Sequence, residues 1–193
     1  MAKLLELDRE IFIFLNSIHS PFFDQLMYLL TETYVWIPLY LALIIVLIRK
    51  YKKNSIWILL GAILTIILAD QITTSIMKPF FARLRPSHEP GLQQLIHLVN
   101  GYKGGLYGFA SSHAANTFGI ATFVWLALKP FMRWSGLIFI WAVVMTYTRI
   151  YLGVHYPGDI LVGGLIGMFV GWTCFKLSTY LIFRNSKNKA HAL

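Results

Sequence analysis

The chain has 193 residues, of which 57% are hydrophobic and 13% are charged, whereas soluble domains contain about 25% charged residues. This composition excludes an ordinary soluble protein and predicts one integral membrane domain. The net charge of +9 does not indicate nucleic-acid binding, because the Lys and Arg residues are concentrated in the joints between apolar segments. The single cysteine, Cys174, lies in an apolar run, so a disulfide framework is excluded.

Apolar residues near the N-terminus recur at spacings of three and four, with charged residues mainly between them. They are Leu4, Leu7, Ile11, Phe14, Leu15 and Ile18. This pattern predicts an amphipathic helix in the membrane interface, and a short second helix is expected after Pro21. We therefore interpret residues 1–32 as interfacial. We do not expect a signal peptide, because the apolar core is short and interrupted and no small-residue cleavage site follows.

Five apolar segments then predict a transmembrane bundle over residues 33–183. The predicted spans are Thr33–Ile48, Ser55–Met77, Ser112–Leu128, Trp134–Thr148 and Asp159–Phe183. Several have uncharged cores of only about 15 residues, or about 23 Å of helix, against about 30 Å of hydrocarbon. Flanking polar residues should therefore lie at or slightly below headgroup level. The predicted fold is an all-α, polytopic membrane bundle forming a single domain, residues 1–193, with residues 184–193 as a cytosolic tail.

The distribution of Lys and Arg predicts the orientation of this bundle. The joint at residues 49–55 holds four of these residues, and the joint at residues 129–133 holds two. Both joints and the basic tail should face the cytosol. The joints at residues 78–111 and 149–158 should then face the other side of the membrane.

The two outer joints also contain cations, against the usual tendency. These cations are Lys78, Arg83, Arg85, Lys103 and Arg149. The alternation of spans brings them to the same membrane face as His113, His155 and Asp159. Ionisable groups near hydrocarbon are costly and usually functional, so we interpret this cluster as the candidate site.

His155 and Asp159 are four residues apart around Pro157, which is favoured in the first turn of a helix. They should therefore lie close together. A carboxylate beside an imidazole fixes its tautomer and favours its positively charged state. This pairing resembles the nucleophile and orienting group of hydrolytic triads.

The start of the third span has the features of an anion site. His113 follows Ser111 and Ser112, and the free N–H groups of a helix N-terminus bind anions. With three cations, Lys78, Arg85 and Arg149, this set suits the oxygens of a phosphoryl group in transfer. The cations would repel a metal ion, so we expect no metal and no other cofactor.

Three segments together closely resemble the signature of the type 2 phosphatidic acid phosphatases. They read KPFFARLRP, ASSH and TRIYLGVHYPGD, and they occupy residues 78–159 in the expected order. The resemblance implies that His155 is the nucleophile that forms a phosphohistidine and that Asp159 orients it. It implies that His113 protonates the leaving alkoxide and then activates water. It also implies a set of phosphate ligands, which are Lys78, Arg85, Ser111, Ser112 and Arg149.

The segments depart from the family pattern at three positions. Ala110 replaces a proline, Ser112 a glycine and Thr148 a serine, and none of these changes removes a catalytic group. Three residues are possible accessories to the site, namely Arg83, Thr148 and Asp70, although helix packing is the favoured role for Asp70. The segment GYKGGLYGF is a lid over the site, a contact for the lipid headgroup or a plain loop. We assign surface or structural roles to the remaining histidines, which are His19, His88, His97 and His191.

The sequence thus predicts metal-independent hydrolysis of a terminal phosphate from a membrane lipid phosphate or diphosphate at the non-cytosolic face. Its expected partners are the bilayer and this lipid, with no nucleic acid and no obligate protein partner. The small size and short loops favour a bacterial inner-membrane enzyme whose site faces the periplasm or exterior. Two alternatives remain open, a vanadium haloperoxidase-like enzyme and a transporter that binds anions or lipids in the same pocket.

Overall fold

The computed structural model describes residues 2–190, and all regular elements in this range are helices. The expected all-α class is therefore confirmed. The last three residues of the predicted tail, including His191, lie outside the described residues.

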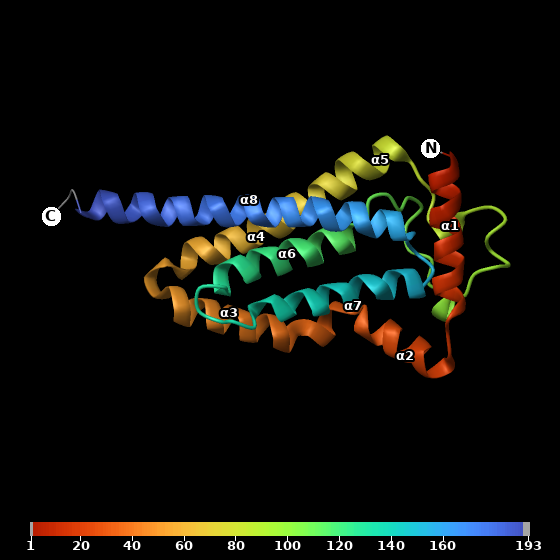
Figure 1. Ribbon diagram of the computed structural model, residues 1–193, viewed down its shortest axis with the longest axis horizontal. Coiled ribbons are helices and arrows are strands. Elements are labelled where there is room, and N and C mark those ends of the chain that lie inside the picture. The colour runs from red at the N-terminus through yellow and green to blue at the C-terminus, as the bar shows by residue number, and fades with distance from the viewer. Residues whose placement is uncertain (1, 191–193) are drawn as a thin grey trace.

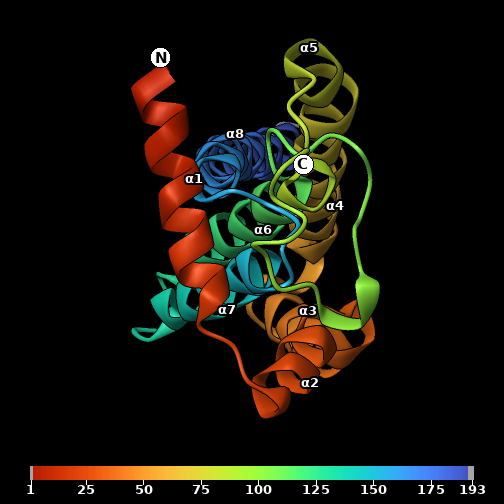
Figure 2. The ribbon, with the colours of Figure 1, turned by 90° about the vertical axis from the view of Figure 1, so that its right-hand side faces the viewer.

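The N-terminal segment forms the two expected helices, α1 (Ala2–Ser17) and α2 (Pro21–Leu30). The Ser20 hydroxyl caps α2 by accepting a hydrogen bond from the Phe23 N–H (3.4 Å), and Pro21 occupies the first helical position. α1 lies across one end of the bundle, roughly perpendicular to the long helices (Figures 1 and 2). Several of its apolar residues are exposed, with Phe14 at 64%, whereas Phe12 is buried. Exposed apolar side chains are expected on a helix seated in a lipid interface.

The bundle is built from α3 (Ile37–Tyr51), α4 (Ser55–Gln71), α6 (Ser112–Leu128), α7 (Ile138–Tyr151) and α8 (Pro157–Ala190). These helices run alternately between the two ends of the molecule (Figure 1). The bounds of α6 coincide with the predicted third span, and α4 begins at Ser55 as predicted. The remaining bounds differ by two to seven residues.

Two helical stretches within the described chain are long and apolar enough to cross a membrane, Thr33–Phe81 and Pro157–Asn188. The first turns back at the short 3₁₀ segment Lys52–Asn54, so it contains both α3 and α4. A shorter apolar stretch, Ser135–Tyr151, includes α7. The count of five spans therefore stays a prediction.

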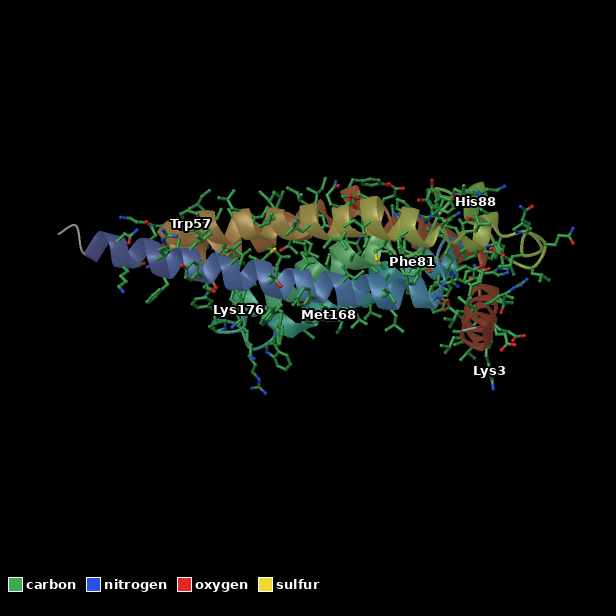
Figure 3. The ribbon with its side chains drawn as sticks, turned by 90° about the horizontal axis from the view of Figure 1, so that it is seen from above. Lys3, Trp57, Phe81, His88, Met168 and Lys176 are labelled. Carbon is green, nitrogen blue, oxygen red and sulfur yellow. The ribbon has the colours of Figure 1, made fainter. Side chains whose placement is uncertain are left out.

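The helix α4 continues without a break toward the outer joint. A π-helical turn, Ile72–Met77, leads into the short helix α5 (Lys78–Phe81). Phe81 and His88 lie toward the end of the bundle where α1 and Lys3 stand, whereas Trp57 lies toward the opposite end (Figure 3). The two predicted outer joints and the N-terminal helices thus meet at one end of the bundle.

The helices α6 and α8 approach each other through glycines. A side chain at Gly163 or Gly167 would collide with the carbonyl of Ser111 or Ala115, respectively. Gly171 has the same relation to Gly119. This close approach brings together the first turns of α6 and α8, which contain His113 and Asp159, and His155 lies two residues before α8.

The helix α8 is longer than the predicted fifth span. It contains 34 residues, or about 51 Å at 1.5 Å per residue. Its C-terminal part extends beyond the other helices (Figure 1). The part of the predicted tail that the structure describes, residues 184–190, is therefore a continuation of the helix.

Candidate active site

The outer loop after α5 doubles back on itself and presents two arginines to the helix ends. The Arg85 N–H donates to the Leu106 carbonyl (3.1 Å), and the Gly108 N–H donates to the Arg83 carbonyl (2.9 Å). Gly108 lies so close to the site that a Cβ there would be 3.0 Å from Asp159 Oδ2 and 3.1 Å from Arg85 Cγ. A side chain at this position would crowd Asp159 and Arg85, so glycine lets the loop pass close to the site.

His155 and Asp159 adjoin each other, as the sequence predicts. His155 Nδ1 is 3.3 Å from Asp159 Oδ2, and the same oxygen accepts a hydrogen bond from the Tyr156 N–H (3.0 Å). Both side chains are almost completely buried, at 2% and 0% exposure. The other carboxylate oxygen, Oδ1, accepts from Arg83 Nη1 at 2.9 Å. Arg83, predicted only as an accessory residue, therefore contacts the carboxylate of Asp159 directly.

The second ring nitrogen of His155 faces Arg85. Arg85 Nη1 is 2.9 Å from His155 Nε2 and also donates to the Val154 carbonyl at 3.2 Å. A guanidinium can only donate, so Nε2 must be the acceptor and the ring proton must lie on Nδ1, toward Asp159. Burial, together with Arg85 and Arg149, lowers the pKa of His155 well below 6.5. The imidazole is therefore neutral at pH 7, with the lone pair of Nε2 directed toward the cations.

The N-terminus of α6 forms the next side of the site. Ser111 is its N-cap, and the Ser111 hydroxyl accepts from the Ala114 N–H at 3.4 Å. The Ser111 N–H donates to the Asp159 carbonyl (3.0 Å), which links the first turns of α6 and α8. Lys78 Nζ donates to Ser112 Oγ at 2.7 Å. His113 follows in the first turn, within electrostatic reach of Arg149, His155 and Lys78.

Arg149 completes the set from the C-terminal end of α7. It donates to Thr31 Oγ1 (2.7 Å) and to the Tyr102 hydroxyl (3.0 Å). None of the described residues accepts a hydrogen bond from its buried Nε atom. Moreover, the four ion pairs found among residues 2–190 include none of Lys78, Arg85 and Arg149. Three cations thus lie around the His155–Asp159 pair without a carboxylate of their own.

Comparison with known proteins identifies the family. Residues 58–183 match the family described as the PAP2 superfamily. The chain belongs to the PAP2 superfamily. It is 39% identical to the lipid A 4'-phosphatase of Bacteroides thetaiotaomicron over 184 residues, which cover 94% of this chain and 81% of the relative. The chain is therefore a phosphatase.

Two solved PAP2-like structures have the same architecture. The crystal structure of Aquifex aeolicus LpxE matches with a TM-score of 0.64 at 28% identity, over 88% of this chain and 95% of that one. The transmembrane PAP2-type phosphatidylglycerolphosphate phosphatase from Bacillus subtilis matches with a TM-score of 0.66 at 21% identity, over 95% of this chain and 88% of that one. Together with the apolar helices, this similarity identifies an integral membrane protein.

Two of the accessory candidates in this PAP2 phosphatase lie beside the phosphate site rather than in it. The Thr148 hydroxyl donates to the Met145 carbonyl (2.7 Å) and lies 3.2 Å from Thr31 Oγ1, so it contacts the residue that accepts from Arg149. Asp70 accepts from Asn116 Nδ2 at 3.4 Å, between α4 and α6. This contact agrees with the packing role that the sequence favoured for Asp70.

Sequence reasoning missed several contacts of the PAP2 site. No sequence pattern marks Thr31 as a site residue, because it lies in the short segment after α2 and contacts Arg149 only in the folded structure. Tyr102 belongs to the Gly- and Tyr-rich segment whose role was left open. It covers Arg149 with its hydroxyl and with its ring, whose centroid is 5.4 Å from the guanidinium carbon. This contact favours the interpretation of the segment as a cover over the site.

The group of metal-ligand residue types found among the described residues lies outside the PAP2 site. It consists of His19, Asp24 and His97. His97 Nε2 is 2.9 Å from Asp24 Oδ1, which also accepts from the Tyr151 hydroxyl (2.7 Å). The rings of His19 and His97 are stacked, with centroids 3.8 Å apart and planes inclined by 5°. The contact between His97 and Asp24 joins the outer loop to α2.

Proposed function

We propose that this protein removes the terminal phosphate from a membrane lipid phosphate or diphosphate at the non-cytosolic face, through a metal-independent phosphohistidine mechanism. The observation that supports this function most directly is the set of three cations, Lys78, Arg85 and Arg149. They surround the neutral His155 without a counter-ion, and a phosphoryl group would supply the missing negative charge. The name of the 39% identical relative, a lipid A 4'-phosphatase, favours hydrolysis over the haloperoxidase and transporter alternatives.

In the proposed first step, His155 Nε2 attacks phosphorus and the bond to the leaving alkoxide breaks. The hydrogen bond donated by Arg85 shifts from Nε2 to a phosphate oxygen. His155 keeps its proton on Nδ1, and the hydrogen bond from Nδ1 to Asp159 stabilises the cationic ring. Lys78, Ser112 and Arg149 neutralise the other oxygens. His113 donates a proton to the alkoxide as it leaves.

In the proposed second step, the roles of the two histidines reverse. The now neutral His113 accepts a proton from a water molecule, and the resulting hydroxide attacks the phosphorus. The phosphorus–nitrogen bond breaks and its electron pair returns to His155. The products are inorganic phosphate and the resting enzyme, so no metal ion or redox cofactor takes part.

The relative named lipid A 4'-phosphatase favours the 4'-phosphate of lipid A as the substrate. The test is phosphate release by the purified enzyme from lipid A, undecaprenyl diphosphate, phosphatidylglycerol phosphate and phosphatidic acid in mixed micelles. We expect the highest kcat/KM with lipid A and, by mass spectrometry, loss of the 4'-phosphate. Release from none of these lipids would contradict the proposed function, and preference for another would correct the substrate.

We expect activity to survive an excess of chelator and to be blocked by vanadate. The site is built from cations and helix N–H groups, which attract a phosphate-like anion and repel a divalent metal. Phosphate release is measured after incubation with the chelator, with and without added divalent ions. Complete loss of activity that a divalent ion restores would overturn the metal-free mechanism.

We also propose five spans in a bacterial inner membrane, with the site facing the periplasm and the domain occupying residues 1–193. The basic joint between α3 and α4 supports this orientation. In intact cells, a membrane-impermeant thiol reagent should label Lys103→Cys, in the outer loop, but not Lys52→Cys. The Cys174→Ser background removes the native thiol, and labelling of both positions or of Lys52→Cys alone would contradict the topology.

A further inference from the structure

One carboxylate of the interfacial helix α1 reaches the edge of the active site. Asp8 Oδ2 accepts a hydrogen bond from Arg83 Nη2 at 2.8 Å. Asp8 Oδ1 accepts from the Gly158 N–H at 2.7 Å. Gly158 is the second residue of α8, so Asp8 binds both an active-site arginine and a free N–H of the helix that contains Asp159.

Arg83 is held on three sides. One Nη atom contacts Asp8, the other contacts Asp159 Oδ1 at 2.9 Å, and the guanidinium carbon lies 4.0 Å from the centroid of the Tyr156 ring. A planar guanidinium clamped by two carboxylates and an aromatic ring has little freedom to rotate. Its position in turn fixes the carboxylate that orients His155.

We propose that Asp8 is a positioning residue of the phosphatase site, acting on Asp159 through Arg83 and on the N-terminus of α8 through Gly158. This inference rests on the catalytic roles proposed above for His155 and Asp159. Without the charge of Asp8, Arg83 keeps Asp159 as its one remaining carboxylate partner and loses the contact that holds its other Nη atom. It is then drawn toward the phosphate, away from Asp159, and the orientation of His155 is lost.

The same contacts tie the active site to the membrane surface. Leu4 and Phe14 of α1 are largely exposed, at 71% and 64%, whereas Asp8 faces the bundle. α1 stands across the end of the bundle at which α8 begins (Figures 1 and 2). The helix that rests in the lipid interface therefore supplies one of the two carboxylates that hold Arg83 in place.

The seating of α1 does not depend on Asp8. Phe12 is fully buried and packs edge-on against Tyr156, with ring centroids 5.3 Å apart. The buried Asn16 donates to the carbonyls of Ile150 (3.2 Å) and Tyr151 (2.8 Å). A change at Asp8 should therefore leave α1 attached and the bundle folded.

The test is Asp8→Asn, which keeps an oxygen for the Gly158 N–H but removes the charge that balances Arg83. We expect kcat to fall about 10- to 100-fold, the scale of a small misplacement of reacting groups, with KM for the lipid nearly unchanged. Glu10→Gln is the matched control, because Glu10 is an exposed carboxylate of the same helix. It should retain wild-type kcat, and thermal unfolding should confirm that both variants are folded.

A double-mutant cycle separates positioning from a purely structural effect. If Asp8 acts mainly through Arg83, the double variant Asp8→Asn/Arg83→Gln should be about as slow as Arg83→Gln alone. Wild-type kcat in Asp8→Asn, or losses that multiply in the double variant, would overturn the inference. If Asp8→Asn does not fold, wild-type kcat in Arg83→Gln alone would equally overturn it.

A parallel measurement on Asp159→Asn distinguishes failure of this inference from failure of the proposed function. A reduced kcat in Asp159→Asn together with a wild-type kcat in Asp8→Asn would contradict only the proposed role of Asp8. Wild-type turnover in Asp159→Asn would contradict the catalytic role proposed for Asp159, on which the role of Asp8 depends.

Discussion

The substitution His155→Ala is expected to abolish lipid phosphate turnover, with a loss of several orders of magnitude. Removal of a catalytic nucleophile in another hydrolase costs about 10⁶-fold in kcat. His155 is the buried imidazole whose Nε2 faces the cations and whose Nδ1 faces Asp159, and alanine leaves no group able to take the phosphoryl. The measurement is single-turnover phosphate release with saturating enzyme, which excludes effects on product release.

The matched control is His88→Ala. His88 lies in the outer loop after α5, and its contact is with the Gly104 carbonyl (3.3 Å) rather than with the His155–Asp159 pair. The His88→Ala variant should turn over lipid at nearly the wild-type rate.

The Asp159→Asn variant should be slow rather than inactive, because the amide keeps much of the geometry but loses the charge that supports the cationic ring. Normal turnover by His155→Ala would show that another residue receives the phosphate.

The substitution His113→Ala is expected to have the second largest effect. General acid–base groups typically contribute about 10²- to 10⁴-fold, and His113 is proposed to act both on the leaving alkoxide and on the attacking water. It stands in the first turn of α6, next to Ser112, which binds Lys78. Steady-state turnover of the lipid substrate should fall within that range.

The leaving group provides a sharper test of His113. A nitrophenyl phosphate leaves as a stabilised anion and needs little protonation, so phosphoenzyme formation by His113→Ala should be much closer to wild type with this substrate. Hydrolysis of the intermediate should remain slow, and an initial burst of nitrophenol should become visible. Equal losses in phosphoenzyme formation from the lipid and from the nitrophenyl ester would exclude a general-acid role.

Local patterns predicted the elements that local interactions determine. The bounds of α6 were predicted from the apolar run that begins at Ser112, and the structure adds that Ser111 caps this helix. The proximity of His155 and Asp159 followed from their spacing at the start of α8. The helical continuation of the tail was not predicted, because its basic sequence resembles a solvated segment.

The contacts that depend on the tertiary fold could not be predicted from the sequence. Arg83 meets Asp8 and Asp159 from positions about 75 residues away on either side. In the sequence, Asp8 is one of several charged residues on the polar face of an amphipathic helix. The spacing of these residues predicts only that Asp8 faces solvent. Thr31 and Tyr102 likewise reach Arg149 only because α2 and the outer loop close over the end of α7.

The most direct test of the central claim is rapid-quench trapping of the phosphoenzyme with a radiolabelled lipid phosphate, followed by mapping of the labelled residue. The phosphohistidine mechanism predicts protein-bound phosphate that is labile in acid, stable in base and attached to His155. The amount should rise in His113→Ala if hydrolysis of the intermediate is slowed more than its formation, and label should be absent in His155→Ala. Acid-stable phosphate on Ser111 or Ser112, or trapped phosphate that persists in His155→Ala, would contradict the assignment of His155 as the nucleophile.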